Sequence, residues 1–465
     1  MFQTKETQTE VTENSPIDIE NATQLESLEK RCERSSLHED DTDVDGNGGG
    51  SVDGNGGGSA ERHVKATDVP LYRALRPLIV SMKIFGLFHE PTLQSLVAVK
   101  GPFIADADHG NRGRSWKIGC GFGCLYHLFV TCCLWVYFLR YIPGFWNFDT
   151  ELELYLKIVY GTWMFQCSCN ATIIYLACRR VSKLPKFLLH WHLFCDGTKM
   201  RAINDRLDKK YLRKKSLVLS VACLILIFVN IAATGYVSLS PNIPDNVQVF
   251  ASPWRSYKVA LGLLFFHAYS TAAWLFPVIF FIVVSLAIIK QFEKLFRDFS
   301  DDITRNDGYA KEIEEFRLWH LHLCEAVAIV DDIFSSLTFI AYLTNIPLAI
   351  FLLYQVLFLR LDSAVPFIMH CYWILCNTAN VALISWFSAE LNDQAHSLLR
   401  IAHFVRIRDP ANDLRFQMYM LVSKLTGPAV GISASGLVVV TKGLILTVVG
   451  VFATYFTLLI QFEMQ

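Results

Sequence analysis

The sequence predicts an all-α fold, a bundle of seven transmembrane helices with a cytosolic amino terminus and an extracellular carboxyl terminus. Three observations lead to this prediction: the composition, the number of long apolar stretches, and the distribution of Lys and Arg between them. Of the 465 residues, 52% are hydrophobic and 34 are Phe, and the mean hydropathy is +0.33. A soluble domain of this length is far less apolar.

Seven stretches are long enough to cross a bilayer as helices, which takes roughly 20 residues. We expect the spans at 117–142, 153–178, 216–240, 258–290, 334–359, 366–391 and 436–463. A shorter stretch at 70–99 has an amphipathic pattern. We expect it to lie at the inner membrane interface without crossing the bilayer.

Lys and Arg are concentrated in every second connection between the spans. The connection 179–215 holds twelve of them, segment 290–333 holds six and segment 392–428 holds five, whereas 143–152 holds none. Connections rich in Lys and Arg stay in the cytosol. The amino terminus is therefore expected in the cytosol and, after seven crossings, the carboxyl terminus outside. A G-protein-coupled receptor has the opposite orientation, so the charge pattern argues against that class.

The chain is expected to consist of two parts, a tail at 1–66 and a membrane domain at 67–465. Residues 1–60 contain 14 Asp and Glu but only 4 Lys and Arg, and the sequence VDGNGGGS occurs twice in tandem. Such an acidic, Gly-rich segment buries too little apolar surface to offset the entropy lost on folding. We expect a disordered cytosolic tail.

Helical patterning continues beyond the membrane in segments 290–335 and 392–435. Phe292, Leu295 and Phe299 fall on one face of the first segment. After the Asn-Asp-Gly turn at 306–308, a second apolar face holds Ile313, Phe316, Leu321, Leu323 and Val327. Helices that leave the membrane with apolar faces must cover those faces by packing together. We therefore expect these two segments to form a cytosolic anchor.

The final span, within 436–465, has one face made of small or polar residues. These residues recur at steps of three and four: Gly443, Thr447, Gly450, Thr454, Thr457 and Gln461. A spanning helix with such a face either packs tightly against a partner helix or lines water. The pattern alone leaves both possibilities open.

Motifs of soluble enzymes are absent from the sequence, and we expect no catalytic residue, metal site, cofactor or nucleic-acid partner. There is no phosphate-binding glycine loop and no HExxH motif. His320 and His322 are two positions apart, which is the wrong spacing for one helical face. Lys157, near the outer end of its span, is expected to extend its amine to the membrane surface.

The outer halves of the spans carry uncharged polar and aromatic residues that should face inward, because unpartnered polar groups are costly in a bilayer. The candidate pocket residues are Tyr160, Trp163, Gln166, His267, Thr271, Trp274, Asn345, Trp373 and Asn377. Asn230 and Thr234 belong to the same inward-facing group. The set suits a small-molecule pocket, while hydrogen bonds between helices are the alternative. Because we see no fixed carboxylate or guanidinium there, we favour a neutral organic ligand.

The end of the chain resembles a known family. Thr454 and Tyr455, five intervening residues, and then Gln461 and Phe462 resemble the TYhhhhhQF signature that ends insect-type gustatory receptors. The resemblance covers residues 67–465. It implies a taste receptor of the plasma membrane that acts as a ligand-gated, non-selective channel for monovalent and divalent cations. It also implies a homotetramer, or a heteromer with related subunits, in which four final helices line a central pore surrounded by membrane lipid.

The resemblance further implies roles for four residues of the final helix. Leu458 and Phe462 match a hydrophobic constriction, with Gln461 between them facing the ion path and Thr454 about one turn away. A hydrophobic ring of this kind blocks ions by dewetting until it widens. The ligand would be a small neutral molecule such as a sugar, although a bitter heterocycle fits the same residues. A membrane scaffold, a transporter and a receptor that signals without conducting ions remain as alternatives.

Overall fold

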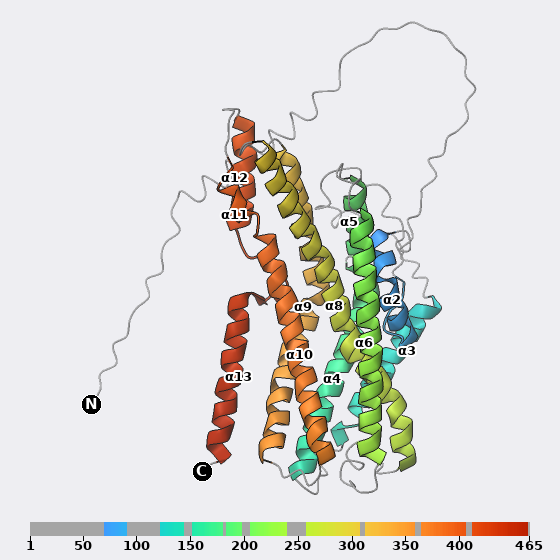
Figure 1. Ribbon diagram of the computed structural model, residues 1–465. Helices are drawn as coiled ribbons and strands as arrows, with labels where there is room; N and C mark the ends of the chain where they lie inside the picture. Colours follow the sequence, from blue (N-terminus) through green and yellow to red (C-terminus); the bar gives the residue numbers. More distant parts are fainter. Residues whose placement is uncertain are drawn as a thin grey trace, which may run out of the picture. The chain divides into compact units, whose positions relative to one another are not determined.

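Helices make up almost all of the described structure (Figure 1). The computed structural model describes residues 69–90, 121–143, 151–179, 183–197, 205–239, 257–306, 312–358, 364–405 and 412–463. All of these residues belong to the unit 61–465. The predicted tail at 1–66 lies outside the described residues.

The elements follow one another in the order of their labels. They are α2 (Pro70–Ile84), α3 (Phe122–Leu139), α4 (Glu151–Arg179), α5 (Leu184–Gly197), α6 (Asp205–Leu239), α8 (Tyr257–Arg305), α9 (Ile313–Phe358), α10 (Ala364–Ala395), α11 (Leu399–Ala402), α12 (Asn412–Thr426), β1 (Ser433–Ala434), β2 (Val438–Val439) and α13 (Lys442–Glu463). The fold is therefore all-α, as predicted, apart from one very short strand pair.

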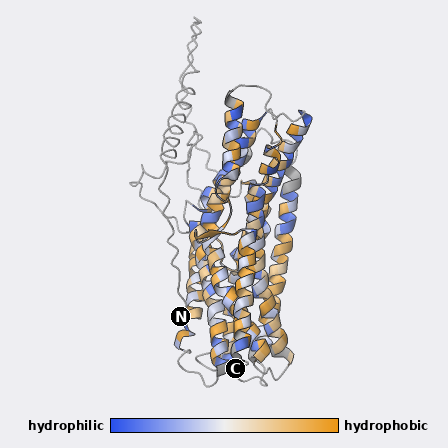
Figure 2. Cartoon of the chain, turned by 90° about the vertical axis from the view of Figure 1, so that its left-hand side faces the viewer, coloured by the Kyte–Doolittle hydropathy of each residue, from blue (hydrophilic) through white to orange (hydrophobic). Residues whose placement is uncertain are grey.

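Each of the seven predicted spans corresponds to one helix: α3, α4, α6, α8, α9, α10 and α13. Among the described residues, five of these helices are long and apolar enough to cross a membrane, namely α3, α6, α8, α9 and α10. The 29 residues of α4 exceed the length of a span, but its inward-facing polar residues lower its hydropathy. Within α13 the apolar part runs over Lys442–Leu458. Figure 2 shows hydrophobic residues along the helices of the bundle.

The helices α8 and α9 are much longer than a membrane is thick. With 49 and 46 residues, they measure about 73 and 69 Å at 1.5 Å per residue, against about 30 Å for the hydrocarbon core. Their extensions pack together, since the rings of Phe299 and Phe316 lie 5.1 Å apart between centroids. Phe292 and Leu295 are also buried. Helical extensions with apolar faces packed together are thus present, although Leu321, expected on the apolar face, is 40% exposed.

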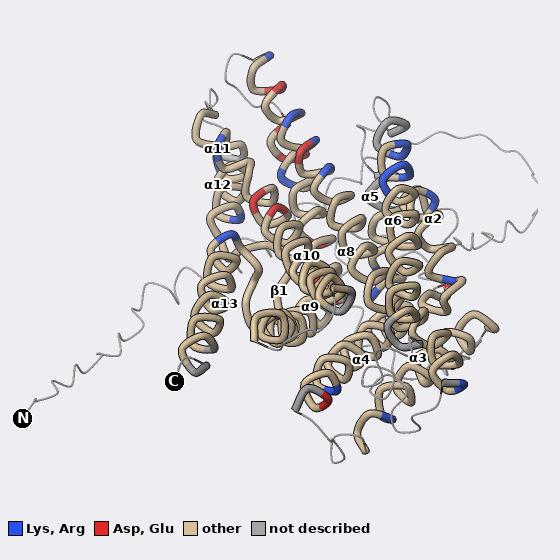
Figure 3. Tube along the Cα trace, turned by 60° about the horizontal axis from the view of Figure 1, so that its bottom comes forward, with Lys and Arg blue, Asp and Glu red and all other residues tan. Residues whose placement is uncertain are grey.

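Charged residues lie mainly at the helix ends and on the parts that extend beyond the apolar spans. Figure 3 shows Lys and Arg around the ends of α5, α6, α11 and α12, whereas the middle parts of the long helices are largely without charge. The described extensions of α8 and α9 include an ion pair between Lys290 and Glu293 at 2.5 Å. Side chains of this kind are tolerated outside the hydrocarbon layer and costly within it.

The connection 179–215 contains a helix that the sequence does not predict, and the amphipathic stretch at 70–99 forms a helix over its first half. Part of the connection 179–215 is helical, since α5 occupies Leu184–Gly197 and α6 begins at Asp205, eleven residues before the predicted start. The amphipathic helix α2 packs against α6, α5 and α8, and Leu78 and Met82 on its apolar face are fully buried. Its apolar face is therefore covered by protein.

A short hairpin lies between α12 and α13. Ser433 pairs with Val439 in the antiparallel strands β1 and β2. The turn between them needs positive φ at both central residues, and Ser435 (φ 54°) and Gly436 (φ 76°) supply it. The segment between α12 and α13 is therefore a folded hairpin that holds the start of α13.

Candidate functional site

A cavity lies among α4, α6, α8, α9 and α10, in the half of the bundle that the sequence places on the outside. Ten residues line it: Val159, Tyr160, Trp163, Asn230, His267, Trp274, Leu348, Leu352, Trp373 and Asn377. Six of the nine candidate pocket residues are among them. The volume within it that the centres of water molecules can occupy is about 30 Å³, enough for roughly two waters. A larger guest would have to widen it.

Asn230 of α6 is the centre of the polar wall of this cavity. Its amide nitrogen donates to Nε2 of His267 at 3.0 Å and to Oγ1 of Thr271 at 2.9 Å. Its amide oxygen accepts a hydrogen bond of 3.2 Å from the indole Nε1 of Trp373. One side chain thus connects α6, α8 and α10 inside an apolar bundle, where hydrogen bonds are strong and costly to break.

Indole, imidazole and phenol rings form most of the remaining wall. The ring of Trp163 lies 4.9 Å from His267 and 6.4 Å from Trp274 between centroids. The ring of Tyr160 lies edge-on to Trp373 at 5.7 Å. Flat rings at these separations offer both faces and edges to a small ligand.

Trp274 and Asn377 each place on the cavity wall a buried polar atom that has no hydrogen-bond partner in the structure. These atoms are the indole Nε1 of Trp274, which is a donor, and the amide Oδ1 of Asn377, which is an acceptor. Both residues are less than 5% exposed. Buried polar atoms are normally satisfied, so a guest that accepts one hydrogen bond and donates another would complete this wall.

Three candidate pocket residues do not line the cavity. Thr271 lies behind its wall and holds Asn230 in place by accepting from the amide. Gln166 lies about 4.5 Å further along α4 than Trp163, at 1.5 Å per residue, and is fully buried. Asn345 is also fully buried and donates to the carbonyl of Ala341 at 2.9 Å within its own helix. These residues have the inward orientation expected, but at other depths or angles.

The sequence reasoning missed the apolar side of the cavity. Val159, Leu348 and Leu352 line it, but an aliphatic residue on an inward face looks the same whether it borders a cavity or a packed core. The sequence predicts that Asn230 faces inward but does not single it out as a pocket residue. Its position one turn before Thr234, which also lies within 3.1 Å of His267 Nε2, was the available signal.

The position of Lys157 contradicts the expectation that its amine reaches the membrane surface. Lys157 is 1% exposed, and its amine lies 2.7 Å from the carboxylate of Glu153, which is 7% exposed. The two are one turn apart on α4, so they share a face. A buried charge needs a partner to offset its desolvation, and Glu153 supplies one.

The final helix α13 lies at the edge of the bundle, where it contacts α9 and α10 (Figure 1). Its partly buried residues recur at helical spacing and include Val448, Phe452 and Phe456. The small and polar face is exposed: Gly450, Thr454, Thr457 and Gln461 lie on the open side. The apolar face therefore packs within the chain, and the small-polar face is free for another partner or for water.

Of the candidate gate residues, Leu458 is 42% exposed, and Thr454 and Gln461 are also exposed. Thr454 donates to the carbonyl of Gly450 at 2.9 Å, so its hydroxyl is satisfied within the helix. The side chain of Phe462 lies outside the described residues. Within one chain, the described gate residues do not close any passage on their own.

Two polar contacts hold the start of α13 to the helices that border the cavity. The carboxylate of Asp331 on α9 accepts hydrogen bonds from the backbone N–H and the hydroxyl of Ser433. Lys442, the first residue of α13, forms an ion pair with Asp393 of α10. The hairpin and the helix therefore follow the positions of α9 and α10.

Comparison with models of protein families shows to which family this chain is related. The model of the family described as 7tm chemosensory receptor matches residues 75–465. The chain belongs to this family. The receptor is thus a multi-pass membrane protein of a chemosensory class, and this class is not one of enzymes.

Solved structures and a curated relative agree with this assignment. The receptor matches the insect olfactory receptor OR5 from Machilis hrabei in complex with eugenol, with a TM-score of 0.62 and 15% identity over 84% of this chain and 98% of that one. A second structure of OR5 gives a TM-score of 0.58 and 14% identity, with the same coverage. These matches establish the seven-helix fold.

A gustatory receptor for sugar taste, 64f, from Drosophila melanogaster is 22% identical to the receptor over 225 residues. The match covers 47% of this chain and 45% of that protein, so the receptor spans about half the length of this relative in the alignment. The similarity connects the receptor to taste receptors within the chemosensory family.

Proposed function

We propose that the receptor is a gustatory-type, ligand-gated cation channel of the plasma membrane that opens when a small neutral organic molecule enters the cavity. The observation that carries this proposal is the cavity itself, in which tryptophan, tyrosine and histidine rings surround unpartnered polar atoms of Trp274 and Asn377. The related sugar-taste receptor makes a sugar the first ligand to test.

The composition of the wall supports a neutral ligand. None of the ten lining residues is Asp, Glu, Lys or Arg. A charged ligand entering this wall would lose its hydration without gaining an opposite charge, which is costly in a low-dielectric site. Rings for stacking, together with the donor of Trp274 and the acceptor of Asn377, suit a molecule with hydroxyl or carbonyl groups.

The exposed face of α13 supports assembly around a pore. Leu446, Val449 and Tyr455 are each more than half exposed on this helix, beside the small-polar face. A helix at the edge of one chain can cover these residues by meeting copies of itself. We propose a homotetramer, or a heteromer with related subunits, in which Thr454, Leu458, Gln461 and Phe462 face the path of monovalent and divalent cations.

The two polar contacts at the start of α13 provide a physical link between cavity and pore. Leu348 borders the cavity on α9 and Asp331 holds the hairpin on the same helix, about 25 Å away at 1.5 Å per residue. On α10, Asn377 likewise borders the cavity, and Asp393 likewise holds the start of α13 through its ion pair with Lys442. A ligand that widens the cavity would displace α9 and α10, and α13 would move with them.

The proposal is tested by whole-cell recording from cells that express the receptor, during application of sugars and plant metabolites. We expect at least one neutral compound to evoke a cation current. Trp163→Ala should lower the response because it removes an aromatic wall, while Leu261→Ala, an exposed position on α8, should leave it unchanged. Absence of any evoked current from a receptor that reaches the surface, with purified protein that is monomeric, would refute the channel.

A further inference from the structure

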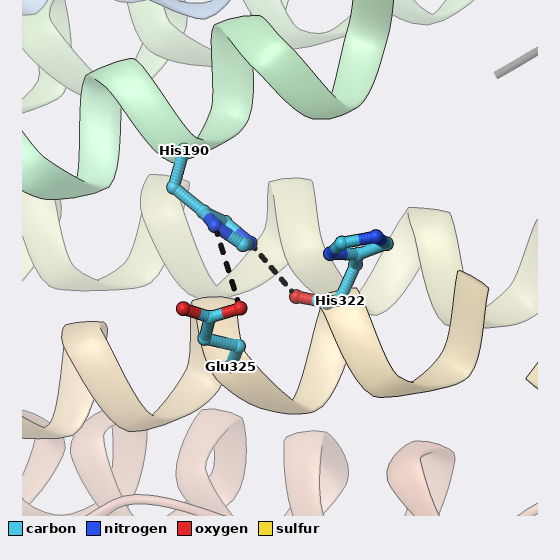
Figure 4. A group of neighbouring side chains, drawn as sticks. All are labelled: His190, His322 and Glu325. Atoms are coloured by element: carbon cyan, nitrogen blue, oxygen red, sulfur yellow. Dashed lines mark hydrogen bonds and ion pairs between the residues drawn. The ribbon is translucent and has the colours of Figure 1, made fainter. Parts of the chain in front are cut away.

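Three side chains with metal-binding atoms meet on the surface between α5 and α9, outside the predicted span at 334–359. They are His190 of α5 and His322 and Glu325 of α9 (Figure 4). Their nearest ligand atoms all lie within 4.8 Å of one another. His322 and Glu325 are three positions apart, so they share one helical face, and His190 approaches that face from the neighbouring helix.

The hydrogen bonding of His190 prepares one of its nitrogens to bind a metal ion. Its Nε2 lies 3.0 Å from the backbone carbonyl oxygen of His322, and because a carbonyl only accepts, Nε2 carries the proton. In the neutral ring the lone pair is then on Nδ1. Metal-binding histidines commonly donate their second ring N–H to a carbonyl in this way, which fixes the ring orientation.

The lone pair of His190 faces the carboxylate of Glu325. Nδ1 and Oε2 are 3.7 Å apart, too far for a hydrogen bond. A metal ion placed between these two electron-rich atoms would be attracted by both. The ring of His322 lies 5.8 Å from that of His190 between centroids, beside the Nε2 edge of His190 in Figure 4.

We propose that His190, His322 and Glu325 bind a zinc ion at the contact between α5 and α9. Two imidazoles and one carboxylate are a donor set that zinc accepts, with water in the fourth position. Ligand atoms around tetrahedral zinc are roughly 3.4 Å apart, given bonds of about 2.0–2.2 Å. The side chains of His322, which is exposed, and Glu325, which is partly exposed, can rotate to close the difference, while buried His190 stays in place.

The sequence could not indicate this site, because His190 and His322 are 132 positions apart. His320, two positions from His322 in the sequence, does not take part, because its Nε2 lies 2.9 Å from the carbonyl oxygen of Ala395. A bound ion would connect α5 to α9, the helix that continues to the cavity. The site would therefore restrain the end of α9 that lies away from the ligand.

The test is zinc binding by the purified full-length receptor in detergent, measured by equilibrium dialysis with metal analysis. Cobalt is added separately, since its visible absorption reports tetrahedral coordination. We expect one zinc ion per chain at micromolar concentration. Glu325→Gln and His322→Ala should each weaken binding by at least about tenfold, a loss in the range seen even for residues that only support metal ligands. His403→Ala, an exposed histidine after α11, should have no effect.

Two results would overturn the proposal. One is a folded wild-type receptor that binds no zinc at micromolar concentration, and the other is unchanged binding in both Glu325→Gln and His322→Ala. The two substituted side chains lie at the surface, so elution of each variant from gel filtration at the wild-type volume shows that the fold is intact. Calcium and magnesium at millimolar concentration should not displace the zinc, because both prefer oxygen ligands.

Discussion

Asp331 and Ser433 form the tightest polar contact between the bundle and the hairpin that precedes α13. The carboxylate accepts the backbone N–H of Ser433 at 2.6 Å, and each of its oxygens lies 2.9 Å from the hydroxyl of that residue. The two residues are 102 positions apart in the sequence. The adjacent N–H of Ser435 donates to the carbonyl of Ser335 at 3.0 Å. The turn before α13 is thereby fixed to α9.

Asp331→Asn should loosen this contact and weaken the transmission of ligand binding to α13. We expect a loss of about 1–3 kcal/mol in unfolding free energy, because hydrogen bonds to a partly buried charge are replaced by weaker ones. The evoked current should fall or the basal current should rise, measured by whole-cell recording. Asp332→Asn, at the exposed neighbouring position, is the control. Equal effects of the two substitutions would contradict a specific role for Asp331.

Trp274→Phe should reduce sensitivity to a ligand that accepts a hydrogen bond in the cavity. The substitution removes the unpartnered Nε1 donor and keeps an aromatic ring. One neutral hydrogen bond contributes about 0.5–1.5 kcal/mol, so the concentration for half-maximal current should rise roughly twofold to tenfold. Because this Nε1 makes no hydrogen bond within the protein, the substitution breaks none and should not lower thermal stability in that way. An unchanged dose–response curve for every active ligand would remove Trp274 from the binding wall.

Gln461→Ala and Phe462→Ala should change ion selectivity or basal leak while surface expression stays normal. Gln461 lies on the exposed side of α13, where its amide would hydrate passing cations, and Phe462 follows it in the candidate constriction. A smaller side chain in a hydrophobic ring favours entry of water and therefore conduction. Reversal potentials under exchanged cations provide the measurement. Val448→Ala, on the face packed within the chain, should affect stability and leave selectivity unchanged.

Lys157→Met should destabilise the receptor because it leaves the buried carboxylate of Glu153 without its lysine partner. Breaking a buried pair by removing one member typically costs about 3–5 kcal/mol. The double variant Glu153→Gln with Lys157→Met should recover much of that loss, since no uncompensated charge remains. Thermal unfolding of the purified receptor in detergent compares the three proteins. A single variant as stable as the wild type would show that the pair contributes little.

The spans and the polar faces were predictable because they depend on residues near one another in the chain. Six candidate pocket residues, Trp163 and His267 among them, line one cavity because helical periodicity decides which side chains point inward. The depth and angle of each helix are decided by packing, which is why Gln166 and Asn345 point inward without lining this cavity. The short helix α5 lies in a connection for which the Lys and Arg residues predict only a cytosolic location.

The sequence by itself determined that this protein has seven spanning helices, an acidic tail and a final helix with one small-polar face, since hydropathy and periodicity are local properties. The tertiary structure decided which distant residues meet. It placed Asn230 against His267 and Trp373, Asp331 against Ser433, and His190 against Glu325. It also turned the small-polar face of α13 outward. The physical reason is that contacts between helices depend on how their side chains interlock over the whole bundle, which no local pattern records.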